Sequence, residues 1–481
     1  MTERRGSADP AALPSVALAR AGSGILLVGA LGSLALLAFA VRLFGASLSI
    51  GPLAWYATFA LPTAGLIWCA LRLRPVARVT LAISCVFASV LVCGTEAALG
   101  LAAQARPVRI QERLATRTGT PFDRRSVPDV VRSLRTSGLD AMPSVVPGII
   151  IPHWAPTAHP RTEWRSALLP LAGVSNRPTV HLCNEDGQFR RYDSDEHGFA
   201  NPASSWSAPS HELALIGDSF THGYCVDVDR SYSGRLRSRW PSLLNLGTGG
   251  SGPLVELATL SEYATPVRPK AVVWQYFGND LDNLALERRN PLLVRYLEGG
   301  FSQGLFSRQA DVDAAIVPWV ERMWAAGKGD DIRARFGWGT VLTLYHLREL
   351  AVGLLPGFDS RGGPSAELPL FGAILREARD RVARWGGRLY FVFVPEWERY
   401  YQPGALAGHD VRDRVLAIAR SLDLPVIDLE PVVREHPDRL QLFARHELAT
   451  AHFSALGHEL MAREVIAAIE KDQAVSVATV R

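Results

Sequence analysis

Ser219 is placed where a serine can act as a nucleophile. It belongs to the run Gly217-Asp218-Ser219, which directly follows the apolar stretch from Leu213 to Ile216. The apolar stretch predicts a buried strand, and the glycine after it predicts a turn into a helix. Open α/β sheets place nucleophiles at such turns. Because serine is a weak nucleophile at neutral pH, it needs a base to take its proton and donors to hold an oxyanion.

Three blocks further along the chain supply residue types for these tasks. A short strand at 242–246 runs into a glycine-rich turn that contains Gly250. The apolar segment 271–277 is followed at once by Asn279, and His452 precedes a helix with apolar periodicity near the C-terminus. Each pattern alone is common, since glycines relieve backbone crowding and Asn-Asp pairs form turns. Their joint placement at strand ends and a helix start favours a single site.

In this order the four blocks resemble the SGNH (GDSL-type) hydrolase family over roughly residues 190 to 470. The resemblance implies an α/β fold, a three-layer, flavodoxin-like parallel sheet flanked by helices. It also implies roles for individual residues. Ser219 matches the nucleophile, His452 the base, Gly250 the backbone donor of the oxyanion hole and Asn279 its side-chain donor. Asp218 is expected to shape the turn.

The sequence departs from the family pattern at two places. The family usually has an aspartate two or three residues before its histidine, where this chain has Ala449 and Thr450. Glu447 is the nearest acid that could orient the ring of His452; alternatively a backbone carbonyl or Thr450 orients it, which leaves a Ser-His dyad. The second departure is Phe277, which stands where the third block usually has a glycine.

The N-terminal part is too apolar for an ordinary soluble enzyme. The chain is 48% hydrophobic with a mean hydropathy of +0.08, and its excess of apolar residues lies in the first hundred positions. Three stretches, about 21–41, 51–71 and 79–101, carry no charge except Glu96 in the third. Each is long enough to cross a bilayer of roughly 30 Å, and three of them exceed what a signal peptide contains. We expect residues 1–103 to form a membrane region of three transmembrane helices that contact the lipid bilayer.

The arginines predict the orientation of this region. They flank the first stretch on its N-terminal side and fill the connection between the second and third stretches, at Arg4, Arg5, Arg20, Arg72, Arg74 and Arg78. By the positive-inside rule these parts are cytoplasmic, and everything after the third helix lies outside. The prediction is a multi-pass protein of the inner membrane with its catalytic domain on the periplasmic or extracellular side.

Two segments follow the predicted membrane region. Residues 104–205, rich in Pro, Arg and Ser, are expected to form an extracytoplasmic stalk and wrapping segment. Residues 206–475 alternate predicted strands and helices, which indicates a parallel sheet with helices on both faces. The strands are expected at about 212–216, 242–246, 271–277, 388–394 and 425–429. Residues 281–366 show helical patterns only and are expected to form a cap inserted beside the active site.

Cysteine usage and charge limit the cofactors and partners. In an oxidising compartment Cys183 and Cys225 could form a disulfide near the nucleophile loop, but pairing cannot be deduced from spacing. No Cys/His spacing indicates a metal site, and no cofactor is expected. The net charge of +4 is small and dispersed, which argues against nucleic-acid binding. The sequence predicts no oligomeric state.

The leading hypothesis is a membrane-anchored, extracytoplasmic serine esterase, either an O-acyl hydrolase or an O-acyltransferase, with acetyl as the expected acyl group. Its substrate would be an ester-bearing envelope polysaccharide, lipid or small molecule. Hydrolysis and transfer share an acyl-serine, so the sequence does not separate them. One alternative is a catalytically weak or silent glycan-binding or assembly protein with the same fold. Another is a thioesterase or lysophospholipase.

Overall fold

The computed structural model describes residues 15–44, 50–119, 121–154, 167–325, 344–347, 350, 364–401, 410–444 and 452–479. The chain divides into two compact units. Unit 1 comprises Met1–Arg106 and Ala334–Arg361, and unit 2 comprises Pro107–Arg333 and Gly362–Arg481. The inserted region after Asn279 therefore contributes residues to both units.

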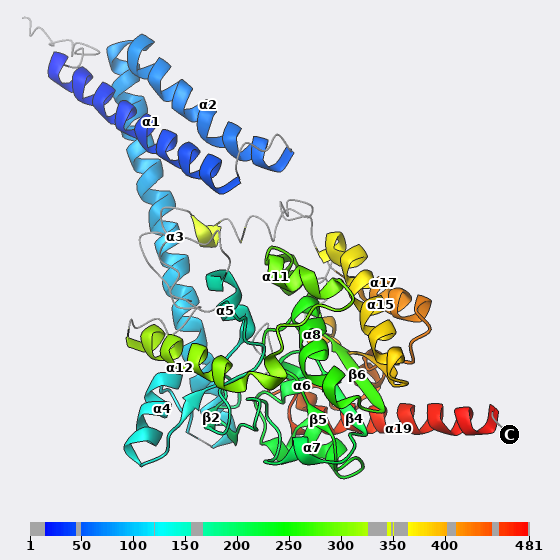
Figure 1. Ribbon diagram of the computed structural model, residues 1–481. Coiled ribbons are helices and arrows are strands. Elements are labelled where there is room, and N and C mark those ends of the chain that lie inside the picture. The colour runs from blue at the N-terminus through cyan, green and yellow to red at the C-terminus, as the bar shows by residue number, and fades with distance from the viewer. Residues whose placement is uncertain are drawn as a thin grey trace, which may run out of the picture. The chain divides into compact units, whose positions relative to one another are not determined.

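Unit 2 is built on a five-stranded sheet whose neighbouring strands are all parallel, in the order β5-β4-β6-β7-β8 (Figure 1). The strands are β4 (Leu213–Ile216), β5 (Leu244–Asn245), β6 (Ala271–Tyr276), β7 (Arg388–Phe393) and β8 (Val426–Asp428). All six residues of β6 are buried, as expected for the centre of a parallel sheet covered on both faces. The predicted α/β fold with a helix-covered parallel sheet is confirmed.

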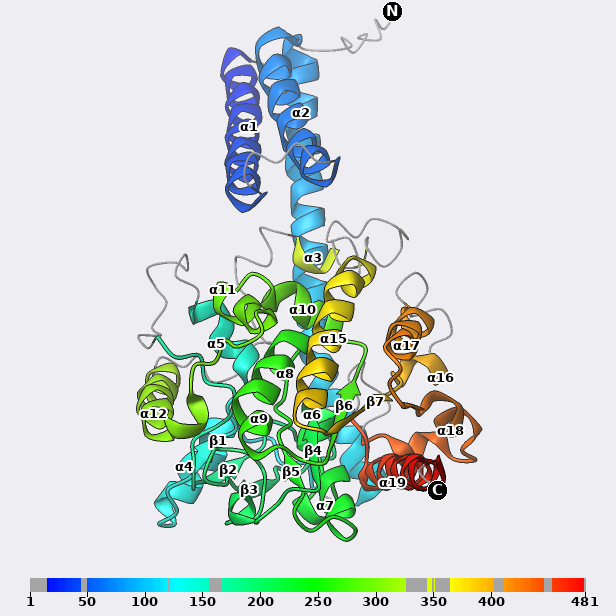
Figure 2. The ribbon, with the colours of Figure 1, turned by 45° about the vertical axis from the view of Figure 1, so that its right-hand side comes forward.

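The two faces of the sheet bury alternate residues of each strand, because successive side chains of a strand point to opposite sides. Ala214 and Ile216 of β4 belong to one apolar cluster, whereas Leu213 and Leu215 belong to the other. The first cluster includes residues of α8 (Pro253–Thr259), α10 (Asp280–Glu287), α15 (Leu368–Arg384) and α17 (Arg412–Ser421). The second includes residues of α7 (Tyr232–Arg237), α18 (Glu430–Glu435) and α19 (Ala455–Thr479). Figure 2 shows α8 and α15 side by side against the strands.

The remaining short elements surround this core. A second, three-stranded sheet has the order β1-β2-β3, with β1 (Met142–Pro143) parallel to β2 (Pro178–Val180) and β3 (Arg191–Asp193) antiparallel to it. It lies in the segment for which no strand was predicted, since strands of two or three residues leave no period to recognise. In the described part of the chain, unit 2 also contains the end of α3 (Pro75–Thr118) and the helices α4 (Val127–Thr136), α5 (Pro147–Trp154), α6 (Ser219–His222), α9 (Thr265–Val267), α11 (Pro291–Val294), α12 (Gln309–Ala325) and α16 (Glu398–Tyr401).

Unit 1 contains α1 (Val16–Phe44), α2 (Ile50–Arg72) and most of α3 (Pro75–Thr118). Two segments, Val16–Ala38 and Pro75–Ala103, are long and apolar enough to cross a membrane. Only 17% and 6% of their most apolar windows are buried, whereas the core helix of a soluble protein would be mostly buried. The second predicted span, 51–71, coincides with α2, and its membrane crossing stays a prediction.

Glu96 has an unexpected environment within unit 1. It is the one charged residue of the third predicted span, and its side chain is fully buried. Its oxygens accept hydrogen bonds from the backbone N–H groups of His346 at 2.8 Å and Leu347 at 2.9 Å. The ring Nδ1 of His346 lies 2.8 Å from the same carboxylate. A carboxylate in an apolar helix is thus matched by polar partners from the inserted region, which offsets the cost of its burial.

Candidate active site

The nucleophile turn forms where β4 ends. Asp218 precedes α6 as its N-cap, and its Oδ1 accepts a hydrogen bond from the backbone N–H of Phe220 at 2.9 Å. Gln275 of β6 braces the same turn, because its Oε1 accepts bonds from the backbone N–H of Asp218 at 3.3 Å and from the Thr221 hydroxyl at 2.9 Å. Ser219 itself is only 7% exposed. Two neighbouring strands therefore fix the position of its hydroxyl.

His452 lies on the approach to α19 and is held by backbone bonds. Its carbonyl accepts a bond from the Ala444 N–H at 2.7 Å, and the next residue, Phe453, pairs with Phe443 in an isolated bridge. Its Nε2 lies 2.8 Å from the hydroxyl oxygen of Ser219. The structure thus brings these two residues, 233 positions apart, within hydrogen-bond distance, which is the geometry a general base requires.

The other ring nitrogen of His452 contacts a residue that the sequence analysis did not single out. Glu185, in the loop that joins β2 to β3, places its Oε1 2.8 Å from Nδ1 of His452. Its Oε2 also accepts the backbone N–H of His452 at 3.0 Å. Glu447 and Thr450, the residues considered for orienting the ring, lie outside the described residues. A carboxylate on Nδ1 fixes the tautomer that leaves Nε2 free to accept a proton from serine.

A disulfide fastens the Glu185 loop to the nucleophile loop. Cys183 and Cys225 are bonded, with their Cα atoms 5.2 Å apart, although 42 residues separate them in the chain. Cys225 has a φ of +68° and lies six positions after Ser219, so the bond bridges the acid and nucleophile segments. The spacing of Cys183 and Cys225 did not establish that they pair. Had the pairing been known, it would have directed attention to Glu185, two residues after Cys183.

The glycine-rich turn packs directly on the nucleophile turn. The backbone N–H of Thr248 donates to the carbonyl of Gly217 at 3.2 Å, and Asn245 Oδ1 accepts the N–H of Gly247 at 3.0 Å. Gly250 has a φ of +69°, a left-handed conformation that glycine adopts without strain. The parallel pairing of β4 with β5 therefore brings the Gly250 turn next to the Ser219 turn, while the role of Gly250 as an oxyanion donor stays a prediction.

Asn279 follows β6 at the same edge of the sheet as Ser219, because β6 pairs in parallel with β4. It is exposed, and among the described residues its side chain makes no capping bond to α10. Its amide is therefore available to a ligand. Phe277, which replaces the usual glycine, is half-buried and packs on Phe220 with ring centroids 4.5 Å apart. The ring centroid of Phe220 in turn lies 5.2 Å from that of His452, so Phe277 and Phe220 form an apolar surface beside His452.

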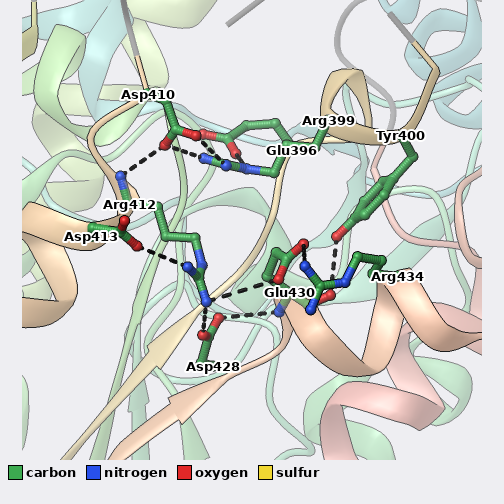
Figure 3. Close-up of polar contacts among 9 residues, drawn as sticks. All are labelled: Glu396, Arg399, Tyr400, Asp410, Arg412, Asp413, Asp428, Glu430 and Arg434. Atoms are coloured by element: carbon green, nitrogen blue, oxygen red, sulfur yellow. Dashed lines mark hydrogen bonds and ion pairs between the residues drawn. The ribbon is translucent and has the colours of Figure 1, made fainter. Parts of the chain in front are cut away.

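An ionic network around Arg399, shown in Figure 3, includes Glu396, which lies against the Gly278-Asn279 turn. Arg399 donates from Nε to Glu396 at 2.6 Å and from both terminal nitrogens to Asp410 at 2.6 and 2.8 Å. Hydrogen bonding from this guanidinium lowers the pKa of the Asp410 carboxyl. The Glu396 carboxylate lies so close to Gly278 that a Cβ there would overlap it.

A second arginine continues this network toward β8. Arg412 donates to Asp413 at 2.9 Å and also to Asp428 at the end of that strand (Figure 3). The segment after β7 thus contributes Glu396, which lies against the turn that carries Asn279.

Buried carboxyl groups gather beneath the nucleophile turn. Burial raises the pKa of Asp218 to about 6 and that of Glu287 to about 7, and it raises those of Glu256 and Asp280 as well. Glu287 nevertheless accepts the backbone N–H groups of Gly252, Leu254 and Val255 at 2.6, 3.0 and 3.3 Å. It therefore fastens the start of α8 to α10.

The raised pKa of Glu287 predicts a pH-dependent stability. The folded-state pKa lies above the unfolded value, so the associated stability is fully present below about pH 4.5 and is lost as pH rises through about 7. A shift of this size corresponds to roughly 3 kcal/mol. Thermal unfolding at pH 5 and pH 8 should show the lower stability at pH 8, and Glu287→Gln should shrink the difference. An undiminished difference in the variant would assign the effect to other groups.

The arrangement can perform acyl transfer at a serine. A carboxylate, an imidazole and a hydroxyl are joined in sequence by two hydrogen bonds of 2.8 Å. This is the arrangement that lets a base remove the hydroxyl proton while a carboxylate stabilises the imidazolium. It comes from three separated segments, at the β2–β3 loop, the end of β4 and the approach to α19.

The model of the GDSL-like lipase/acylhydrolase family matches residues 215–460, just over half of the chain. No curated protein matches the chain significantly.

Several solved structures resemble part of the chain. A member of the lipolytic G-D-S-L family from Veillonella parvula is 14% identical, with a TM-score of 0.30 over 53% of this chain and 97% of that one. A lipase/acylhydrolase from Enterococcus faecalis is 13% identical, with a TM-score of 0.30 over 55% and 96%. An acetylxylan esterase from Geobacillus stearothermophilus is 15% identical, with a TM-score of 0.29 over 54% and 94%. From the match of the family model, the chain belongs to the GDSL-like lipase/acylhydrolase family of SGNH ester hydrolases.

Proposed function

We propose that this protein is a membrane-anchored, extracytoplasmic serine esterase that removes or transfers a short acyl group, with acetyl as the expected group. The observation that carries the proposal is the continuous contact from Glu185 through His452 to Ser219. Its substrate would be an ester on an envelope polysaccharide or lipid.

The reaction follows from the proton positions in this contact. His452 Nε2 takes the proton of the Ser219 hydroxyl as its oxygen attacks the ester carbonyl, and Glu185 stabilises the resulting imidazolium at Nδ1. The tetrahedral intermediate collapses to an acyl-serine, and His452 returns the proton to the departing alcohol. Water or a second hydroxyl group then attacks the acyl-serine, again losing its proton to His452, and the serine is regenerated.

The backbone N–H groups of Ser219 and Gly250 and the amide of Asn279 are the proposed oxyanion donors. Two features support this assignment. The Gly250 turn is hydrogen-bonded to the nucleophile turn, and Asn279 is exposed at the edge where β4 and β6 end. Donors fixed by strands need no reorganisation when charge develops on the carbonyl oxygen, which is the main source of their catalytic effect.

The case for a silent binding protein depended on the missing acid before His452. Glu185 supplies a carboxylate at Nδ1 from another segment, so this argument no longer favours a silent protein. The membrane anchor and the external location are supported by two apolar helices that expose most of their side chains and by a disulfide, which persists in oxidising compartments.

Two measurements test the proposal together: the dependence of ester turnover on the length of the acyl group, and covalent labelling of Ser219. The purified full chain in detergent should hydrolyse p-nitrophenyl acetate, with kcat/KM falling as the acyl chain lengthens. A fluorophosphonate should modify Ser219, as located by peptide mass spectrometry, and protein unfolded beforehand should not react. If Ser219 is labelled but esters with long acyl chains are hydrolysed faster than acetate, the protein is instead a lipase or lysophospholipase. If Ser219 is not labelled and no ester is hydrolysed, the protein is the non-catalytic binding protein.

Removal of the Asn279 amide should lower turnover without unfolding the protein. A lost oxyanion donor costs about 2.7–4 kcal/mol of transition-state stabilisation, or roughly 10²–10³-fold in kcat. Asn283→Ala, one turn further along α10, is the matched control, because its amide contacts the Ser251 carbonyl at 3.4 Å. Equal kcat values for the two variants would remove Asn279 from the oxyanion hole.

A further inference from the structure

The disulfide lies directly against the acid–base pair. Sulfur atoms of Cys183 and Cys225, a carboxylate oxygen of Glu185 and a ring nitrogen of His452 all lie within 4.8 Å of one another. Both cysteines are buried, whereas the other two side chains are half-buried. Glu185 and His452 are also joined by two hydrogen bonds, one of them through the backbone, so their proximity does not depend on the disulfide alone.

These four donors are of the types that zinc selects. Zinc prefers tetrahedral sets of thiolate, imidazole and carboxylate, at about 2.3 Å for sulfur and 2.0–2.2 Å for nitrogen and oxygen. Two donors on one zinc ion therefore stand roughly 3.3–3.8 Å apart, which small side-chain rotations could achieve from the present positions. In the disulfide form, however, the sulfur atoms are bonded to each other and neither is a thiolate.

We propose that reduction of the Cys183–Cys225 disulfide creates a zinc site that withdraws His452 from catalysis. A dithiol reductant exchanges with the disulfide, becoming a disulfide itself and leaving two cysteine thiols. Zinc binds the two thiolates, Glu185 and His452, and the two thiol protons are released to solvent.

Zinc on either nitrogen of His452 disables the base. A metal on Nε2 occupies the lone pair that must accept the serine proton. A metal on Nδ1 displaces Glu185 from that nitrogen and leaves the proton of the neutral ring on Nε2. The Ser219 hydroxyl then has no base in either case. The disulfide thus protects the active site from metal binding, and the inhibition part of this inference rests on the proposed esterase function.

Metal binding can be measured without any turnover. The test uses the full chain with Cys69, Cys85 and Cys93 replaced by serine, because these are the free thiols among the described residues. After reduction and removal of the reductant under inert gas, Co²⁺ should produce a thiolate-to-metal charge-transfer band, and one equivalent of Zn²⁺ should displace it. The oxidised chain should give no band. A reduced chain without the band would overturn the proposal whether or not the protein is an esterase.

Activity provides the second arm of the test. Ester turnover of the reduced chain should fall at least about tenfold with one equivalent of Zn²⁺ and return on addition of EDTA, before the disulfide re-forms. The Cys183→Ser/Cys225→Ser variant, compared with its own zinc-free rate, should lose this sensitivity. Equal inhibition of the oxidised chain or of this variant would place the inhibiting zinc elsewhere. If the reduced chain gives the cobalt band but neither the reduced nor the oxidised chain hydrolyses esters, the metal site is supported and the esterase function is contradicted.

Discussion

Ser219→Ala should abolish ester turnover while leaving the fold intact. The Ser219 hydroxyl is the nucleophile in the proposed reaction, and an alanine methyl group cannot form the acyl intermediate. Loss of the nucleophile in hydrolases of this logic costs at least about 10⁴-fold in kcat, with residual rate from the oxyanion hole and substrate binding. The alanine side chain fits the buried site, since it only removes one oxygen atom from a position that is 7% exposed.

The measurement is kcat for p-nitrophenyl acetate, together with thermal unfolding of both proteins. Ser233→Ala is a matched control, because Ser233 is another buried serine of unit 2 whose hydroxyl contacts Asn245 rather than a catalytic group. Its turnover should stay close to that of the wild type. If Ser219→Ala retained a substantial rate in a folded protein, the hydrolysis would require a different nucleophile or an activated water.

The fold was predictable because its elements carry strong local patterns. The buried stretches at β4 and β6 are continuous apolar runs, and both precede turns with glycine, so their type and order follow from periodicity. The strand β5 has only two residues, and its prediction at 242–246 rested on the glycines that follow it. The three-stranded sheet had neither signal, because its pairing depends on contacts between distant segments.

The site was predictable only in part, for a related reason. Ser219 and His452 each lie beside a recognisable strand or helix boundary, whereas Glu185 lies in a hairpin loop rich in polar residues. Nothing local distinguishes Glu185 from Asp186 beside it, which pairs with Arg190 at 2.5 Å. Its contact with His452 spans 267 positions, so it forms only when these two distant segments fold against each other. A family pattern that places the acid just before the histidine directed the search to residues 447–450, which lie outside the described residues, and away from Glu185.

Glu185→Gln is therefore the variant that distinguishes a triad from a dyad. Glutamine keeps the length of the side chain but removes the negative charge, and its NH₂ group can donate to Nδ1. This would favour the tautomer with its proton on Nε2, which cannot accept the serine proton. In the serine protease template the equivalent change lowers kcat by about 10⁴-fold, and we expect a loss of roughly 10²–10⁴-fold here.

The kinetic pattern should separate an effect on chemistry from an effect on structure. Because Glu185 acts through His452, kcat should fall while KM changes little, and the rate of fluorophosphonate labelling should fall in parallel. Asp186→Asn is the control on the same loop, since it removes a carboxylate that faces Arg190. Wild-type kcat in Glu185→Gln, with the disulfide intact, would show that the Ser219–His452 pair works as a dyad. An equal loss of kcat in Asp186→Asn would mean that both substitutions disturb the structure of the loop, and that the charge of Glu185 is not the cause.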